Sequence, residues 1–425
     1  MNVSDLDLGE PAEVPVLLVL GTGRRQFREY ILAALAEQAL LVAVDTRLPS
    51  WQSAYTEEFA TCAPDVHSQL AAGRELARSH RVAGVVSLDE RFAESAALLA
   101  EELGLPGPGT AVVRTCLDRW QTRRMLNDAG VGTVRARLAV TAREAEQAVR
   151  ELGLPAVLRA RFHSTSPAPQ RVDRPDEVEQ AFLLAGGGVT PAALGGARPG
   201  GVVVEPVLEG SELTLACTVQ DGRVRTWFAA HRERALAASH ESRQYLVDGH
   251  GAPDRALAAF AQRVHAALGI RHGVTHVSLV RTADGPRVTR VGAWLAGDLV
   301  PLIGCMATGV DLATASAHLA LGVRVRERVE FRRAAGVRIV YPAGAVALAH
   351  PGEDRVLEHG AGTALVRTVP EDEVEGSAPV GELGSVALLA ASAADGPSCR
   401  AALDAAASGH RPATRPVRAA GTVRG

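Results

Sequence analysis

The chain has 425 residues, of which 47% are apolar and 22% are charged, and its net charge is −3. This composition is typical of a globular protein of two or three domains, and it excludes collagen, long disordered chains and nucleic-acid-packaging proteins. All 45 basic side chains are arginines, because the sequence contains no lysine. Enzymes that need a lysine Schiff base, a pyridoxal-phosphate lysine or a lysine nucleophile are therefore excluded. Asn, Ile and Tyr are also scarce, so the absence of lysine is by itself weak evidence about function.

The cysteines and the N-terminal segment bear on the cellular compartment. Five cysteines make an odd total without a C-x-x-C pair, which argues against a zinc knuckle and a disulfide framework and favours a reducing cytoplasm. The first ten residues are acidic, and the longest apolar runs are far shorter than a membrane span. We therefore expect a cytoplasmic protein with no membrane partner. The near-neutral charge and 4% aromatic content argue against a nucleic-acid partner.

The first 112 residues predict a parallel α/β domain. A buried apolar strand, a Gly-Thr-Gly turn, an amphipathic helix and a second buried strand form a β-α-β unit, and the same alternation continues to the Gly/Pro-rich breaker at 104–109. The strands are expected at 14–20, 39–44 and 83–87, and the helices at 26–37, 69–79 and 91–103.

The middle of the chain predicts an antiparallel domain at 113–325, with subdomains of about 113–185 and 186–325 on either side of a Gly/Pro/Ala-rich stretch. Residues 326–408 are expected to form a β-rich extension, and 409–425 a disordered tail. The expected elements are a helical stretch at 111–129, strands at 134–140 and 156–161 around a helix at 142–152, a meander of 201–208, 213–220 and 224–231, a helix at 253–268, a hairpin of 274–281 and 287–291, and a helix at 311–321.

Six segments in this order carry a resemblance to a known family. They are ELGLPGPG (102–109), LDRWQTRRMLNDAGV (117–131), ELGLPAVLRA (151–160), VVVEPVLEGSEL (202–213), GVTHVSLVRT (273–282) and RVGAWLAGDLVPLIGCMATGVDL (290–312). The chain resembles the ATP-grasp superfamily, and most closely its carboxylate-amine ligases, which join amino acids by amide bonds. The resemblance implies an α/β fold and an ATP-dependent activation of a carboxylate to an acyl phosphate, which an amine then attacks. It also implies small-molecule carboxylate and amine substrates.

The nucleotide-binding half of the family pattern is partly kept. Arg119 and Arg159 stand where the family has two phosphate-gripping lysines, and a guanidinium keeps the charge and can bind phosphate in a fork. Glu205 and Glu212 match the hinge acid and the acid that accepts the ribose hydroxyls; solvated acids beside a turn are the simpler interpretation of either residue alone. The phosphate-covering loop is reduced to 163–169, where Ser164 and Ser166 keep hydroxyls but no glycine remains and two prolines remove donors.

The metal-binding half of the family pattern is replaced. The family uses two glutamates and an asparagine for magnesium, followed by an arginine, and the matching positions are Ser278, Arg290, Gly292 and Trp294. Magnesium prefers carboxylate oxygens, so the resemblance implies ATP as a possible ligand and makes Mg2+ doubtful. Ser278 and Arg290 are expected to be cross-strand neighbours, with Gly292 on the same face. The charge of Arg290 could hold a phosphate without a metal, but a simple pair with a nearby acid such as Asp298 is the favoured interpretation.

Three other patterns have simpler interpretations. The Gly21-Thr22-Gly23 turn lacks the third glycine of a dinucleotide fingerprint. His265, His272 and His276 are expected to be ordinary histidines rather than metal ligands. Asp89 and Glu90 follow a strand where α/β folds bind ligands, although acids at this place also cap helices.

Two hypotheses of function remain open. The first is a ligase that has rebuilt its site around arginines, and the second is a catalytically silent relative that acts as a nucleotide-binding or partner subunit. A homo-oligomer or a protein partner is possible under both.

Overall fold

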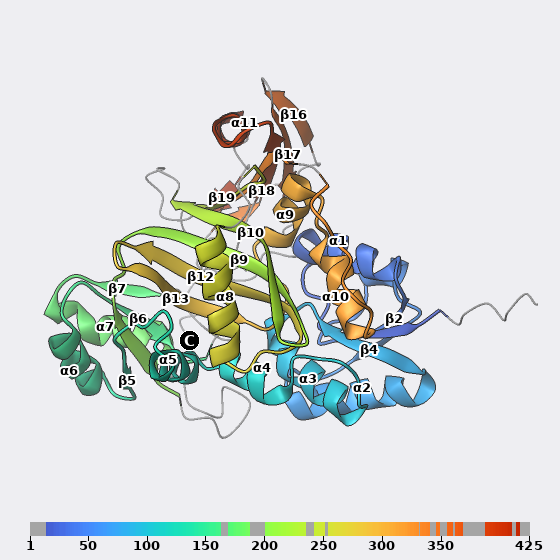
Figure 1. Cartoon of the computed structure of the whole chain (residues 1–425), viewed down its shortest axis with the longest axis horizontal. Coiled ribbons are helices and arrows are strands. Elements are labelled where there is room, and N and C mark those ends of the chain that lie inside the picture. The colour runs from blue at the N-terminus through green and yellow to red at the C-terminus, as the bar shows by residue number, and fades with distance from the viewer. Residues whose placement is uncertain are drawn as a thin grey trace, which may run out of the picture.

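The structure is a computed structural model, and it describes residues 14–162, 169–187, 200–234, 242–250, 254–330, 332–340, 346–348, 355–359, 362–368, 387–409 and 414–416. Figure 1 shows a long central sheet with the N-terminal domain on one side, a small antiparallel sheet on the other, and the C-terminal extension at one end.

The N-terminal domain is built on a parallel sheet of order β3-β2-β1-β4. The apolar run of β1 is buried because the sheet is covered on both faces, as is usual for parallel sheets. The expected parallel sheet is therefore present, with one additional edge strand, β3, whose four residues are too few for a clear strand pattern. Its elements are β1 (Val16–Leu20), α1 (Arg25–Ala36), β2 (Leu40–Asp45), η2 (Trp51–Ala54), β3 (Glu58–Thr61), α2 (Val66–Ser79), β4 (Val82–Ser87), η3 (Glu90–Phe92) and α3 (Ala93–Glu102).

The helical stretch expected at 111–129 is two helices, α4 (Thr110–Leu117) and α5 (Arg119–Asp128). Asp118 separates them because its backbone is extended and its side chain accepts a hydrogen bond from the backbone N–H of Gln121, which caps α5. The stretch is helical as expected, and the break at Asp118 is the detail that apolar periodicity does not detect.

The second sheet is antiparallel, with the order β5-β8-β6-β7. The meander expected from 201 to 231 was wrong in its first strand, because β8 pairs with β5 and β6 instead of β9. The sheet therefore extends past the subdomain boundary expected at 186. Its elements are β5 (Arg137–Ala139), α6 (Ala142–Leu152), β6 (Ala156–Ala160), β7 (Gln170–Val172), η4 (Pro175–Glu177), α7 (Val178–Phe182), η5 (Leu183–Gly187) and β8 (Val202–Pro206).

The central sheet has nine strands, in the order β13-β12-β9-β10-β11-β14-β18-β17-β16. The C-terminal extension continues this sheet, because β14 pairs with β11 on one side and with β18 on the other. Its elements are β9 (Ser211–Gln220), β10 (Arg223–Arg234), β11 (Ser242–Asp248), α8 (Arg255–Ala267), β12 (Gly273–Thr282), β13 (Gly285–Gly292), α9 (Val300–Thr308), α10 (Leu312–Ala320), β14 (Ala334–Val340), β16 (Arg355–His359), β17 (Gly362–Thr368), β18 (Ala387–Ala393) and α11 (Gly396–Gly409).

A short pair, β15 (Val346–Leu348) and β19 (Thr414–Pro416), completes the described strands. β19 lies within the tail expected to be disordered, and the rest of that tail after Gly409 lies outside the described residues.

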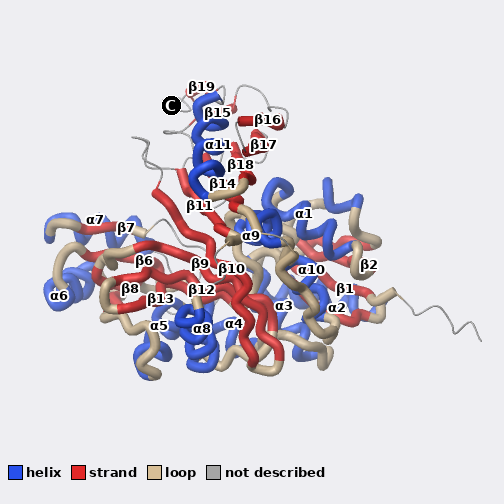
Figure 2. The backbone as a smooth tube through the Cα atoms, turned by 45° about the horizontal axis from the view of Figure 1, so that its top comes forward, coloured by secondary structure: helices blue, strands red, loops and turns tan. Residues whose placement is uncertain are grey.

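The two faces of the central sheet bury separate cores. Leu213, Leu215 and Cys217 of β9 face the core under α8, whereas Ala216 faces the core that also contains α9, α10 and α1 of the N-terminal domain. This alternation follows from the period of two along a strand. Figure 2 shows the strands running through the molecule with helices on both sides.

No single described helix is long and apolar enough to span a membrane. By length and composition alone, α9 and α10 pass this test as a pair with a bend of 108°.

Helix α9 approaches β10 so closely that Gly304 has no room for a side chain. A Cβ atom added at Gly304 would lie 1.9 Å from the ring of Phe228, which is fully buried. We expect Gly304→Ala to lower the free energy of unfolding by about 1–3 kcal/mol, although alanine favours a helix, because the ring must move in a packed core. Urea unfolding measures this. Gly107→Ala is the control, since its Cβ would make only an ordinary contact with Ala100 at 3.4 Å, and Phe228→Leu should restore part of the loss in Gly304→Ala.

Candidate functional site

Charged side chains gather where α5, β6 and β8 meet. Arg119 is the first residue of α5, Arg159 lies in β6 and Glu205 lies in β8. Because β6 and β8 are antiparallel neighbours and Arg159 is opposite Val203, Arg159 and Glu205 project from the same face of the sheet. The structure thus brings together three of the residues that the family pattern singled out.

Glu205 is the centre of this group. Its carboxylate is 2% exposed and accepts hydrogen bonds from Arg159 Nη1 and Arg123 Nε, both at 2.7 Å. Arg123 also donates from Nη2 to the carbonyl oxygen of Val288 at 2.7 Å. Arg123 was missed in the sequence, although its spacing of four from Arg119 places both on one face of α5 and could have indicated it. Through Arg123, the second sheet is joined to β13 of the central sheet.

Burial and the neighbouring charges shift the pKa values of Glu205 and Arg119. Burial alone would raise the pKa of Glu205, but the charges of Arg123, Arg159 and Arg119 outweigh it and hold this pKa below the usual 4.5. Burial, followed by repulsion from Arg159 and later Arg290, lowers the pKa of Arg119 from 12.5 to about 9. Arg119 nevertheless stays protonated, as arginines do in proteins, so a positive charge is held in a buried place beside other positive charges.

The start of α5 is fixed to the end of β6. The backbone N–H of Arg119 donates to the carbonyl oxygen of Arg161 at 2.8 Å, and Arg119 Nε donates to that of Ala160 at 3.1 Å. Arg161 in turn donates to both carboxylate oxygens of Asp118, at 2.7 and 3.1 Å. Asp118, which caps α5, therefore also forms an ion pair with Arg161, and this pair positions Arg119.

The hairpin of β12 and β13 has the expected pairing at the positions that the family resemblance assigns to magnesium. Ser278 is opposite Arg290, and His276 is opposite Gly292. The loop is shorter than expected, with two residues at 283 and 284, and a bulge next to Ser278 compensates for the difference. Ser278 Oγ is hydrogen-bonded to Thr214 Oγ1 at 3.0 Å, so its hydroxyl is turned toward the neighbouring strand β9.

Arg290 forms an ion pair with Glu90, the first residue of η3 in the N-terminal domain. The expected pair with a nearby acid is therefore present, but the acid is Glu90 rather than Asp298, which accepts a hydrogen bond from the hydroxyl of Tyr245 at 2.8 Å. Glu90 was noted in the sequence only for its place at a strand end; its distance of 200 residues from Arg290 hid the pairing. The guanidinium of Arg290 also lies 6.0 Å from the ring centre of Trp294.

Gly292 and Trp294 both pack against the ring of His276. A Cβ atom at Gly292 would lie 2.1 Å from the His276 ring, so the expected asparagine does not fit there without movement of that ring. The rings of His276 and Trp294 pack edge to face at 5.9 Å, and His276 Nδ1 lies 3.1 Å from the Trp294 carbonyl oxygen. Burial, and secondarily the charge of Arg290, lowers the pKa of His276 to about 3, which keeps the ring neutral.

Magnesium does not fit this set of side chains. Ser278, Arg290 and Gly292 offer one hydroxyl and a fixed positive charge where a divalent cation prefers carboxylates. Within the described ranges, no group of three or more His, Cys, Asp or Glu residues is placed to hold a metal ion.

The remaining sequence candidates lie elsewhere. Glu212 is in β9 and pairs with Arg232 at 2.9 Å, with about a third of its side chain exposed. Ser164 and Ser166 lie outside the described residues. The carboxylate of Asp45 accepts hydrogen bonds from the N–H and hydroxyl of Thr22, both at 2.7 Å, so it closes the Gly-Thr-Gly turn internally.

The three neighbouring histidines do not form a cluster. His265 is hydrogen-bonded to the Ala261 carbonyl and the Thr275 hydroxyl, whereas His272 contacts the Leu319 carbonyl at 2.9 Å. His276 is hydrogen-bonded to the Trp294 carbonyl oxygen, so each of the three histidine rings has a different partner.

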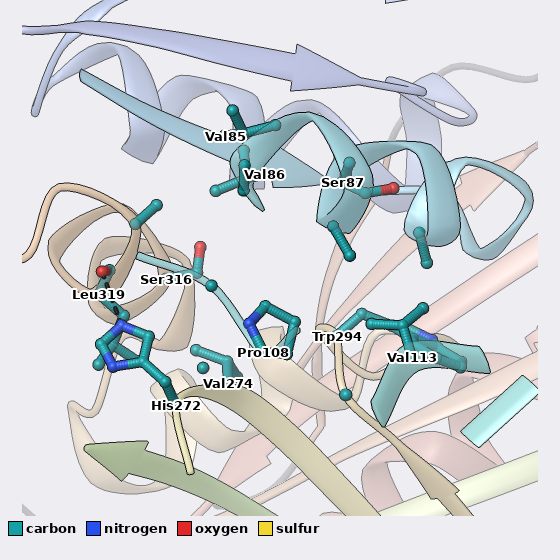
Figure 3. Close-up of a pocket in the computed structure, with 18 of the residues that line it drawn as sticks. Val85, Val86, Ser87, Pro108, Val113, His272, Val274, Trp294, Ser316 and Leu319 are labelled. Atoms are coloured by element: carbon teal, nitrogen blue, oxygen red, sulfur yellow. Dashed lines mark hydrogen bonds between the residues drawn. The ribbon is translucent and has the colours of Figure 1, made fainter. Parts of the chain in front are cut away.

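An apolar cavity of about 80 Å³ lies between the N-terminal domain and the central sheet. Figure 3 shows Val86 and Ser87 of β4 on one side, Trp294 and Val274 on the other, and Ser316 of α10 at one end. The polar groups on its wall have partners within the protein, since Ser316 donates to Ala313 O and His272 contacts Leu319 O. The cavity therefore suits a small apolar group, and Trp294 joins it to the Arg290 and Glu90 pair.

The sequence matches no model of a known protein family. Among curated proteins, it is 27% identical over 341 residues to an uncharacterized protein, y4rH, of Sinorhizobium fredii strain NBRC 101917 / NGR234, covering 76% of this chain and 68% of that protein. It is also 33% identical over 153 residues to the D-alanine–D-alanine ligase of Desulforudis audaxviator, covering 34% of this chain and 47% of the ligase.

Solved structures extend the similarity over nearly the whole chain. The L-amino acid ligase from Bacillus licheniformis superposes with a TM-score of 0.75 at 19% identity, covering 95% of this chain and 98% of the ligase. The chain has the ATP-grasp fold. The biotin carboxylase domain of the Hydrogenobacter thermophilus 2-oxoglutarate carboxylase, in complex with MgADP, ADP and bicarbonate, has a TM-score of 0.69 at 15% identity, covering 94% of this chain and 91% of that domain. The ATP-grasp fold predicted from the sequence is thereby confirmed.

We expect Glu205→Gln in this ATP-grasp protein to lower the free energy of unfolding by about 3–5 kcal/mol at neutral pH, because it leaves the buried Arg123 without a counter-charge. Since the pKa of Glu205 is lowered by folding, its contribution is present above its usual 4.5 and is lost as the pH falls through the lowered value. The difference between the variant and the wild type should therefore shrink in acid. Urea unfolding from neutral to acidic pH measures it.

Glu212→Gln is the matched control for this prediction, because the Glu212 and Arg232 pair is exposed and should contribute at most about 1 kcal/mol. Equal losses in the two variants would show that the Glu205 network has no special role in stability.

Proposed function

We propose that this ATP-grasp protein is a relative of the carboxylate-amine ligases that binds a nucleotide but does not catalyse magnesium-dependent formation of an acyl phosphate. The observation that carries the proposal is Arg290, which stands at a position where the family holds magnesium and is paired with Glu90. The protein would then act as a nucleotide-binding subunit or as the partner of a biosynthetic enzyme in the cytoplasm.

The ligase branch is supported by the similar proteins themselves. The curated match in Desulforudis audaxviator is a D-alanine–D-alanine ligase, and the solved structure from Bacillus licheniformis is an L-amino acid ligase. The apolar cavity beside Trp294 offers room for the apolar part of a small molecule, such as the side chain of a carboxylate or amine ligand.

Nucleotide binding is supported by the positive charge at Arg119 and Arg159, whose guanidinium groups can donate hydrogen bonds to phosphate oxygens. ATP fits this part of the site only in part, because the Glu205 carboxylate is already bound by Arg123 and Arg159. When bound, ATP supplies a phosphoryl group for carboxylate activation in the family; here the arginines would hold and orient its phosphates.

The loss of catalysis is supported by charge. Two carboxylates of the family pattern are replaced by a hydroxyl and a guanidinium, so the site changes from attracting a divalent cation to repelling it. Glu90 is already the partner of Arg290, and the described residues contain no group of three or more His, Cys, Asp or Glu side chains that could hold a metal ion.

The direct test is phosphate release from ATP with magnesium and a panel of amino acids. The wild type should release no phosphate above the rate without protein. Turnover that depends on magnesium and on an amino acid would instead establish the active ligase with an arginine-based site.

A designed variant tests the assignment of the metal positions. Ser278→Glu and Arg290→Glu restore two facing carboxylates, and Glu90→Gln removes the acid that would otherwise repel them. Gly292 is left unchanged because its Cβ would meet His276. We expect the triple variant to gain magnesium-dependent ADP binding, measured by calorimetry. The matched control carries Gln at positions 278, 290 and 90, and no difference between the two would refute the assignment.

A further inference from the structure

A surface rich in arginine lies at one end of β9 and β10, where the turn between them contacts the segment 323–330 that connects α10 to β14. Residues 220–225, 271 and 323–330 make up this arginine surface. They include six exposed arginines and three acids, which are Arg223, Arg225, Arg271, Arg324, Arg326 and Arg328, and Asp221, Glu327 and Glu330. Six minus three leaves an excess of three positive charges, on a chain whose net charge is −3. Among the residues that the structure describes, none forms an ion pair with any of the six arginines.

Hydrogen bonds hold the parts of the arginine surface together. Gln220 donates from Nε2 to the carbonyl oxygen of Val323 and accepts at Oε1 from the N–H of Val325, both at 3.4 Å. The N–H of Gly222 donates to the carbonyl oxygen of Arg271 at 2.9 Å. The six guanidinium groups therefore belong to one continuous surface of the molecule.

The segment 323–330 has an inner and an outer side, although it belongs to no helix or strand. Val325 packs against the core, and the carboxylate of Glu327 lies 3.3 Å from Nδ1 of His318, so both side chains face the protein. The alternate residues Arg324, Arg326 and Arg328 are exposed. This alternation is typical of an extended chain, in which every second side chain is on the same side at a spacing of roughly 7 Å. The outer side is thus a row of three guanidinium groups.

The backbone of this segment also has unused hydrogen-bonding groups. In the described part of the chain, the N–H and C=O groups of residues 326–329 form no hydrogen bond with another residue. The unpaired backbone of an extended segment can pair with a strand from another chain. Such a strand would place every second one of its side chains beside an arginine of the row.

We propose that the segment 323–330 binds an extended acidic peptide of a partner protein by β-strand addition, with carboxylates at alternate positions of the peptide beside Arg324, Arg326 and Arg328. Arginine suits this role because its guanidinium group can bind a carboxylate through two hydrogen bonds. The inference goes beyond the proposed function and does not depend on nucleotide binding. It gives the partner enzyme of that proposal a place to dock.

The arginine surface favours a peptide over a single-stranded nucleic acid. The bases of single strands bind by stacking on exposed aromatic rings. Residues 220–225, 271 and 323–330 include no aromatic side chain. The adjoining Trp227 is 4% exposed, and the guanidinium of Arg225 covers its ring at 3.7 Å. The surface therefore offers charge and backbone groups without a stacking platform.

The test is fluorescence anisotropy of the full chain with a labelled peptide Glu-Thr-Glu-Thr-Glu-Thr-Glu. The comparison peptide is Glu-Glu-Glu-Glu-Thr-Thr-Thr, which has the same composition and charge. We expect the alternating peptide to bind about tenfold more tightly, because only its acids match the spacing of the arginines. Equal affinity of the two peptides, or no binding of the alternating one, overturns the inference. Tighter binding of oligothymidylate or of phosphatidylglycerol vesicles overturns the choice of a peptide.

A triple variant locates the binding. Arg324→Gln, Arg326→Gln and Arg328→Gln remove three exposed charges that have no partner in the described protein, so we expect the variant to fold. Its affinity for the alternating peptide should fall by about tenfold or more, because three ion pairs with the peptide are lost.

The matched control carries Arg124→Gln, Arg143→Gln and Arg255→Gln. These arginines of α5, α6 and α8 are also exposed and without an ion pair in the described protein, so the change in net charge is the same. The control should keep the affinity of the wild type within about twofold, since distant exposed charges are screened. Thermal unfolding confirms that both variants are folded. Equal losses in the two variants would mean a general attraction of charge and would contradict the site.

Hydrogen exchange distinguishes strand addition from attraction between charges alone. We expect the amide groups of residues 326–329 that face the bound peptide to exchange about tenfold or more slowly than in the free protein, because strand pairing protects them. Mass spectrometry of peptic fragments that cover this segment measures the exchange. Binding of the alternating peptide without this protection overturns the strand addition.

Discussion

The two ion pairs of the Glu205 carboxylate are the interaction on which the arrangement of the candidate site depends. The carboxylate is buried in β8 and receives one arginine from α5 and another from β6, and the arginine from α5 continues to the backbone of β13. A single acid thereby fixes two elements of the second sheet domain against the central sheet. Its removal would leave Arg123 charged and buried, a situation that proteins tolerate poorly. The same bonds bring Arg119, Arg159 and Arg290 within range of one another's charge.

The charges of the site also determine which ions it attracts. An ATP-grasp site with carboxylates on the β12 and β13 hairpin attracts a divalent cation, whereas Ser278 and Arg290 offer a hydroxyl and a positive charge. Glu90 comes from the N-terminal domain to pair with Arg290, so the substitution is accommodated by a partner on another domain. Gly292 and Trp294 likewise pack closely around His276, so the hairpin has a well-packed interior with the residues that it contains.

Local sequence patterns predicted the elements whose signals are local. The buried strand β1, the hairpin of β12 and β13 and the pairing of Ser278 with Arg290 follow from an apolar run and from alternating strands, although the hairpin loop is one residue shorter than expected. Three further features were not predicted correctly. Asp118 separates α4 from α5 through a cap and an ion pair with Arg161, β8 pairs with strands on its N-terminal side, and β3 is an edge strand of four residues.

The sequence by itself determined the fold and raised the doubt about magnesium. The six ordered segments indicated the ATP-grasp fold, which the structure confirms, and the identities of residues 278, 290 and 292 led to the hypothesis that the magnesium ligands of the family are replaced. Only the tertiary structure decided the partners of the remaining charges: Arg123 for Glu205, Glu90 for Arg290 and Tyr245 for Asp298. These pairs join residues 53 to 200 positions apart. No pattern of spacing selects one acid among many at such separations, because the selection is made by the packing of whole domains.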